Sequence, residues 1–157
     1  MKGLQFKIDG DWAHFKKPET NNNPLSHDLI PKTALIGMIG AVLGIEREKM
    51  KSLFPQLSED LLYGVELLKP VKKASCGFTS HTAINPTAIK SPKAFEMLRD
   101  VSYKVCVGLY GERSQSIFDD FQNAILEGYA IYDPYLGIAN CPAELTFISH
   151  GEFTMMG

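Results

Sequence analysis

The segment Thr33–Ile45 constrains the fold most, because it is too apolar for a protein surface and too short to cross a membrane. A spanning helix needs about 20 consecutive apolar residues. Pro31 stands where a helix can begin, since its fixed φ and missing N–H suit the first turn. The sequence therefore predicts a buried helix over Thr33–Ile45, with the charged residues Glu46–Met50 as a candidate continuation.

Small residues line one face of this predicted helix. Gly37, Gly40, Ala41 and Gly44 recur at spacings of three and four residues. Each glycine costs up to about 1 kcal/mol relative to alanine in a helix interior, so something must offset that cost. Two explanations stay open, namely close packing on a sheet and a smooth face that accepts a ligand. The GxxG pattern of KH domains is also matched, but it lies inside an apolar helix and we reject it.

The other predicted elements surround this helix in an order that indicates the fold class. Leu4, Phe6 and Ile8 alternate with polar residues, which is typical of a half-buried strand. Apolar residues at helical spacing predict a second long helix over Ser114–Leu126, which Gly128 can cap. The other expected elements are a short helix at Leu53–Leu62, strands at Tyr63–Leu68, Val101–Leu109 and Ala143–Ile148, and a hairpin or extended excursion at Lys69–Pro92.

This order predicts an α+β fold, namely a ferredoxin-like (RRM-like) βαββαβ antiparallel sheet with helices on one face and a basic hairpin excursion. We expect one domain over residues 1–157. RRM domains use this plan to bind RNA, but the chain lacks their aromatic motifs, so base stacking on the sheet is not expected. The direction of His14 stays open, because Gly10 can insert a bulge and reset which side chains point inward.

Charge is distributed unevenly along the chain. The net charge is −2, yet residues 69–104 carry seven Lys and Arg against two Asp and Glu, and residues 105–157 carry one against seven. Such blocks predict one positive and one negative face, unless they arise by chance. The three cysteines are far apart and match neither a disulfide nor a metal pattern, which favours a reducing, cytoplasmic compartment.

The start of the Thr33–Ile45 helix is a candidate phosphate site. Free backbone N–H groups and the helix dipole favour an anion there. Lys32 and Thr33 add a charge and a hydroxyl, and Lys16 and Lys17 precede an asparagine-rich polar loop that leads to this corner. The alternative is that these lysines are merely solvated.

The middle excursion is a second candidate contact with nucleic acid. Its lysines make it basic, and an aromatic ring and an imidazole in it can stack on bases. A clamp for single-stranded RNA and a solvated loop both remain open. The residues concerned are Lys69, Lys72, Lys73, Phe78, His81, Lys90 and Lys93.

Catalysis has weaker support in the sequence. A metal-independent ribonuclease needs a general base and a general acid. His14, His27, His81 and His150 are candidates, but no spacing selects a pair. Motifs of nucleotide-binding loops, hydrolases and metalloenzymes are absent, so no cofactor or metal is expected.

Two motifs taken together resemble the CRISPR-associated Cas5 family, in the RAMP superfamily of ferredoxin-like RNA-binding proteins. The first is Trp12–Pro18, WAHFKKP, and the second is Ile30–Gly44, IPKTALIGMIGAVLG. Tyr135-Leu136-Gly137-Ile138, followed by Ala143, is similar to the family's segment before its last strand. The likeness is closest to the subtype I-B branch.

The resemblance implies a non-catalytic subunit of a type I surveillance (Cascade) complex that grips the 5′ handle of CRISPR RNA beside the backbone and large subunits. The excursion 69–92 would be the family's thumb, and a further C-terminal β region would be missing. No membrane or small-molecule cofactor is expected. The alternative is an endoribonuclease, as in the subtype I-C branch, that processes precursor RNA. The expected RNA contacts are His14, Phe15, Lys16, Lys17, Asn22, Lys32, Thr33, Lys72 and Lys73.

Overall fold

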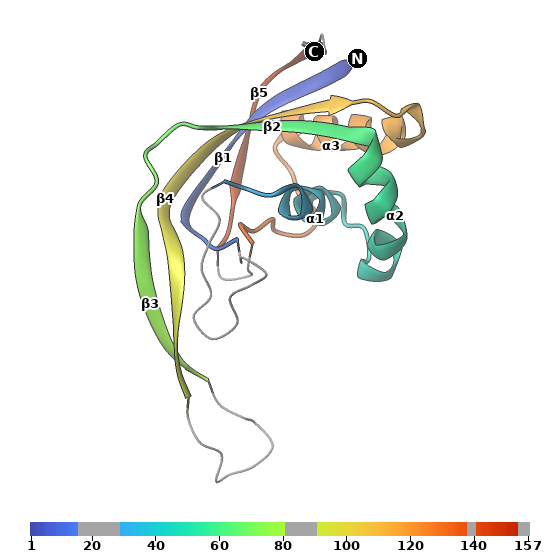
Figure 1. Ribbon diagram of the computed structural model, residues 1–157. Helices are drawn as coiled ribbons and strands as arrows, with labels where there is room; N and C mark the ends of the chain where they lie inside the picture. The colour runs from blue at the N-terminus through green and yellow to red at the C-terminus, as the bar shows by residue number, and fades with distance from the viewer. Residues whose placement is uncertain (16–28, 81–90, 138–140, 154–157) are drawn as a thin grey trace.

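Three helices lie on one side of an open antiparallel sheet (Figure 1). The computed structural model describes residues 1–15, 29–80, 91–137 and 141–153, with only the backbone at 75–80 and 91–95. In chain order, the elements are β1 (Lys2–Ala13), α1 (Lys32–Leu43), α2 (Arg47–Asp60), β2 (Leu61–Leu67), β3 (Lys73–Ser80), β4 (Ser91–Leu109), a short 3₁₀ turn (Glu112–Ser114), α3 (Gln115–Glu127) and β5 (Glu144–Glu152).

The five strands form a single sheet in which β4 pairs with three other strands, β1, β2 and β3. The order is β2-β4-β1-β5, and all pairs are antiparallel. Pairing of β4 with β1 runs from Gly3↔Gly108 to Ala13↔Leu98, while β2 and β3 share the opposite edge of β4. The predicted α+β class with an antiparallel sheet is therefore confirmed.

The core lies between the sheet and the helices. Leu4, Phe6 and Ile8 are fully buried, which confirms their predicted inward direction. The ring of Phe6 meets that of Phe121 on α3 edge-on, with 5.5 Å between centroids. Burial of each such side chain stabilises the fold by roughly 1.5–3 kcal/mol. The same layer includes Leu35, Ile36 and Ile39 of α1 and Tyr103, Val105 and Val107 of β4.

The boundary between the first two helices differs from the prediction. Gly44 adopts a left-handed conformation, with φ 68°, and its N–H bonds to Ala41 O and Gly40 O. This cap ends α1 at Leu43, so Glu46–Met50 does not continue it, and α2 begins at Arg47. The predicted short helix at Leu53–Leu62 is part of the longer α2, which contains Pro55.

The excursion forms a hairpin, as one of the two alternatives predicted. Lys73↔Leu98 through Ser80↔Ser91 pair β3 with the first part of β4. The prediction of a strand over Val101–Leu109 alone was wrong in extent, because the pairing with β3 and β1 extends β4 across Asp100, which has φ 50°. The hairpin turn, 81–90, lies outside the described residues.

The buried carboxylate of Asp60 and the half-exposed guanidinium of Arg113 join the end of α2 to the start of α3. The Asp60 carboxylate is 5% exposed and accepts hydrogen bonds from Arg113 Nε at 2.8 Å and from Ser114 Oγ at 2.5 Å. Its backbone oxygen accepts the N–H groups of Tyr110 and Gly111. The hydrogen bond from Arg113, followed by that from Ser114, holds the pKa of Asp60 below its ordinary value.

The C-terminal elements follow the prediction closely. α3 ends at Gly128, which caps it with φ 76°. β5 is longer than the predicted Ala143–Ile148, since its ladder with β1 continues to Lys2↔Glu152. Within the described part of the chain, no helix has both the length and the apolar character needed to cross a bilayer.

Candidate nucleic-acid interface

A pocket of about 300 Å³ lies at the N-terminus of α1, where three distant segments of the chain meet. One segment is the end of β1, the second is the start of α1, and the third follows α3. Its lining residues are His14, Phe15, Pro31, Thr33, Ala34, Gly37, Tyr135 and Gly137. We call it the α1 pocket. All three motifs singled out in the sequence contribute to it.

Backbone contacts hold the third segment against the end of β1. The N–H of His14 donates to Leu136 O at 3.1 Å, and the N–H of Leu136 donates to Cys141 O at 2.6 Å. Gly137 has φ 91°, and a Cβ on it would be 1.8 Å from His14 O. Glycine is required here on both counts.

His14 and Phe15 line the pocket from the core side. His14 is 1% exposed, and its Nδ1 lies 2.7 Å from Glu96 O on β4. Phe15 is 2% exposed and its ring lies 6.3 Å from that of Tyr103. Both side chains therefore point inward, which answers the question of direction that the sequence left open.

The first turn of α1 is suited to an anion. Pro31 caps the helix with an extended ψ of 160° and provides no side-chain hydrogen bond, and the first turn has no acidic residue. The first N–H groups of an α-helix have no acceptor within the helix. Thr33 is exposed in this turn. Together with the dipole, these groups favour a phosphate at the pocket.

Lys32 has another partner. Its Nζ donates to Ser58 O, near the end of α2. The side chain therefore ties the start of α1 to α2 in this structure. Its ammonium group contributes positive potential near the pocket without pointing at it.

The glycines of α1 have different roles. A Cβ on Gly40 would be 2.9 Å from Met50 Sδ, so this glycine permits close packing of α1 on α2. Gly44 caps the helix. Gly37 is exposed, and among the described residues nothing lies within 4 Å of where its Cβ would be. Gly40 is therefore explained by close packing, but on α2 and not on the sheet as predicted, and the ligand-accepting face stays a prediction.

The hairpin lysines are partly engaged with acids. Lys73 Nζ lies 3.5 Å from Glu96 Oε1, and Lys69 Nζ lies 3.1 Å from Asp100 Oδ1. The hydrogen bond from Lys69 lowers the pKa of Asp100. Lys72 is exposed.

Several of the predicted residues fall in other parts of the chain. Lys16, Lys17, Asn22, His27, His81 and Lys90 lie outside the described residues, and the side chains of Phe78 and Lys93 are not described. The two described histidines do not converge, because His150 pairs with Leu4, ten residues from His14 along β1. That separation is roughly 30 Å at the rise of a strand. Across the described ranges, no three His, Cys, Asp or Glu side chains group in a way that could hold a metal ion.

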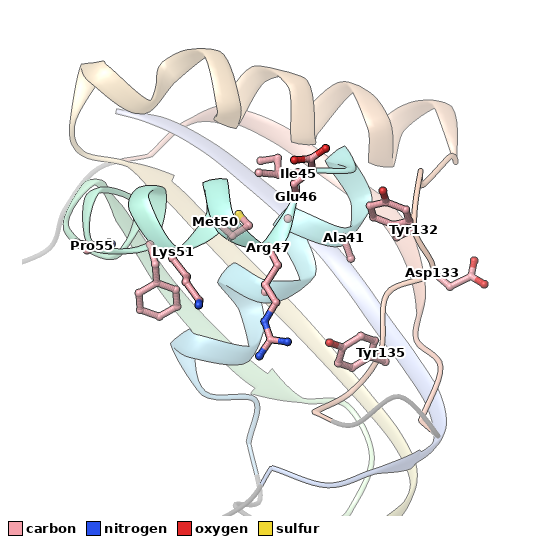
Figure 2. Close-up of a pocket in the computed structure, with 13 residues that line it drawn as sticks. Ala41, Ile45, Glu46, Arg47, Met50, Lys51, Pro55, Tyr132, Asp133 and Tyr135 are labelled. Atoms are coloured by element: carbon pink, nitrogen blue, oxygen red, sulfur yellow. The ribbon is translucent and has the colours of Figure 1, made fainter.

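A larger groove, of about 1020 Å³, lies beside the α1 pocket and was missed by the sequence analysis (Figure 2). We call it the α1–α2 groove. Arg47 and Lys51 of α2 stand on one side, and Tyr132 and Tyr135 on the other. The tyrosines are 55% and 46% exposed. The signal was the aromatic run in Tyr129–Tyr135, of which only the end was singled out.

Comparison with known proteins identifies the relatives of this chain. The model of a family described as CRISPR-associated protein (Cas_Cas5) matches residues 3–152. A search of curated proteins found no match.

Several solved structures share the fold. A CRISPR-associated protein is 15% identical, with a TM-score of 0.54 over 95% of this chain and 69% of its own. A chain of a CRISPR RNA-guided surveillance complex is 16% identical, with a TM-score of 0.62 over 88% of this chain and 58% of its own. A chain of a Type III-B Cmr-beta complex bound to cognate target RNA is 12% identical, with a TM-score of 0.57 over 95% of this chain and 60% of its own.

Proposed function

Because this chain belongs to the Cas5 family of CRISPR-associated proteins, we propose that it binds the 5′ handle of CRISPR RNA as a non-catalytic subunit of a type I surveillance (Cascade) complex. The observation that carries the proposal is the α1 pocket. Its walls come from the three motifs that resemble the family, and it opens at a helix N-terminus without an acidic residue. A phosphate group of RNA suits such a corner.

The expected RNA contacts divide by role. Thr33 offers a hydroxyl, and the N-terminus of α1 offers N–H groups, directly at the pocket. His14 and Phe15 form its inner wall. Lys16, Lys17 and Asn22 follow Phe15 in the sequence and are proposed to continue the contact along the RNA backbone. Lys72 and Lys73 are proposed to contribute from the hairpin.

The arrangement of the sheet supports the ferredoxin-like plan. Setting the hairpin strand β3 aside, the order β2-β4-β1-β5 interleaves the strands of the two βαβ halves, with their helices on one face. We propose a single domain over 1–157, with 69–92 as a thumb against the backbone subunit, and a member of the subtype I-B branch. The large subunit is the other expected protein partner.

The proposal is tested by binding of single-stranded RNA with the CRISPR repeat sequence of the host to the full chain, measured by fluorescence anisotropy at several salt concentrations. Phosphate contacts make affinity fall steeply with salt. Removing the charges of Lys16, Lys17 and Lys32 together should weaken binding and lower the salt slope, whereas Lys49→Gln, an exposed position on α2 outside the pocket, should not. Wild-type affinity in the triple variant would refute the site, and a cleavage product in EDTA would refute the non-catalytic role.

A further inference from the structure

We propose that the α1–α2 groove is a second nucleotide seat, in which a base of single-stranded RNA stacks on Tyr132 or Tyr135 while Arg47 and Lys51 neutralise the adjoining phosphates. The inference rests on the RNA-binding function proposed above and extends it from the start of α1 along the helix. It assigns a ligand class to a groove that was not predicted from the sequence.

The two sides of the groove carry complementary chemistry. Arg47 and Lys51 lie one turn apart on α2, and the guanidinium of Arg47 hangs over α1 on the side that faces Tyr135 (Figure 2). Tyrosine rings provide the stacking surfaces that proteins use to bind single strands without base selection, and cations follow the backbone. The carboxylates of Glu46 and Asp133 also border the groove, but that of Asp133 points away from it (Figure 2).

The groove adjoins the α1 pocket. Gly37 and Tyr135 line both hollows. Gly37 stands at the junction without a side chain, and the described residues leave the space beyond it open. Glycine is the least favourable residue in a helix interior apart from proline. Packing explains Gly40 but not Gly37. An RNA strand that passes over α1 at Gly37 requires a surface without a side chain, which explains this glycine.

RNA suits the groove better than a peptide helix does. Arg47 and the adjoining helix N-terminus both favour an anion, and Lys51 adds a positive charge that it shares with Glu48, whose Oε1 lies 3.7 Å from its Nζ. A volume of about 1020 Å³ beside a pocket of about 300 Å³ leaves room for successive nucleotides along one path. A protein segment as occupant is an outcome that the experiment below distinguishes.

The first test removes one side of the groove at a time. Tyr132→Ala should weaken binding of fluorescein-labelled repeat RNA by roughly 5- to 100-fold, the effect of losing one base–aromatic stack. Arg47→Gln should lower the slope of log affinity against log salt by about one. The controls are Tyr129→Ala, which removes another exposed tyrosine, and Lys49→Gln, which removes another exposed positive charge of α2; both positions lie outside the groove.

The second test fills the junction. Gly37→Leu should leave the melting temperature unchanged or raise it, since leucine favours the helix and the space is open. It should nevertheless weaken RNA binding at least tenfold. Ser52→Leu introduces the same side chain at an exposed position of α2 that does not line the groove and should have no effect on affinity. Repeat RNA containing 4-thiouridine should cross-link to Tyr132 or Tyr135.

The outcomes separate this inference from the function on which it rests. Failure of the wild-type chain to bind repeat RNA overturns both. A second outcome is that the wild type binds and the lysine variants of the α1 pocket weaken binding, but the groove variants do not. That outcome overturns the groove proposal alone. Groove variants that keep RNA affinity but lose association with co-expressed surveillance-complex subunits overturn it in favour of a protein-binding groove.

Discussion

Gly137 lies so close to the carbonyl oxygen of His14 that a Cβ on Gly137 would be 1.8 Å from that oxygen. This contact joins the segment after α3 to the end of β1 and closes the α1 pocket. It also explains why the Tyr-Leu-Gly motif ends in glycine, because the φ of 91° and the lack of space both exclude a side chain.

The first prediction concerns that glycine. Gly137→Ala should lower the free energy of unfolding by roughly 2–4 kcal/mol, through backbone strain and a steric clash. Gly151→Ala is the matched control, because Gly151 has no positive φ and nothing within 4 Å of its Cβ position among the described residues. Urea denaturation of both variants measures the difference. Equal stability of the two variants would contradict the contact.

The second prediction separates stability from binding at the start of α1. Thr33→Asp places a carboxylate in a first turn that has none, which should stabilise the helix by about 0.3–1 kcal/mol. The same charge should repel a phosphate at the α1 pocket and weaken binding of repeat RNA roughly tenfold, equivalent to about 1.4 kcal/mol. Thr33→Asn is the uncharged control. A loss of both stability and affinity would indicate misfolding instead, and unchanged affinity would refute a phosphate at this turn.

The third prediction tests the packing of α1 on α2. Gly40→Leu should destabilise the chain by about 1–3 kcal/mol, because its side chain would overlap Met50. Adding Met50→Ala should recover at least half of that loss, since it removes the obstructing atoms. A double-mutant cycle of thermal unfolding measures the coupling. Strictly additive effects would show that the two residues do not meet.

The fourth prediction concerns acid. The pKa of Asp60 is lowered in the folded state, so its contribution to stability is complete above the unfolded pKa of about 3.9 and is lost as the pH falls through the folded value. Wild-type stability should therefore decline below about pH 5, and Asp60→Asn should flatten that decline while lowering stability at neutral pH.

The comparison for this experiment is Asp100→Asn. The pKa of Asp100 is also lowered, by Lys69, but this pair is exposed and should be screened by salt. Unfolding curves from pH 3 to pH 7 at low and high salt distinguish the two carboxylates. If the stability of Asp60→Asn falls with pH as steeply as that of the wild type, Asp60 is not the source of the loss of stability in acid.

The sequence predicts elements whose signal is local. α3 follows from apolar spacing and Gly128, and the inward residues of β1 follow from alternation. The first part of β4 escapes prediction, because Pro92 and several charged residues hide a strand that pairing with β3 and β1 creates. The division of α1 from α2 depends on the conformation of Gly44, which the apolar pattern does not reveal.

The candidate site shows the same limit. Motifs at Trp12–Pro18, Ile30–Gly44 and Tyr135–Ile138 are recognisable as a resemblance, but only the fold brings them to one pocket. The direction of the Lys32 side chain depends on the carbonyl oxygen of Ser58 on α2, which is distant in the sequence. The sequence did not predict the α1–α2 groove, although Gly37 and Tyr135 belong to motifs, because Arg47 and Lys51 come from a separate segment that only the fold brings beside them.

The segment that carries the groove tyrosines is fastened to α1 by its main chain. The N–H groups of Ile131 and Tyr132 donate to Val42 O and Ala41 O, at 3.0 and 2.9 Å. Every amino acid except proline has such an N–H, so these two hydrogen bonds do not depend on the side chain at position 132. A chain with other residues at Tyr132 or Tyr135 would have a different groove surface on the same backbone. Selectivity in this groove can therefore diverge at little cost to folding.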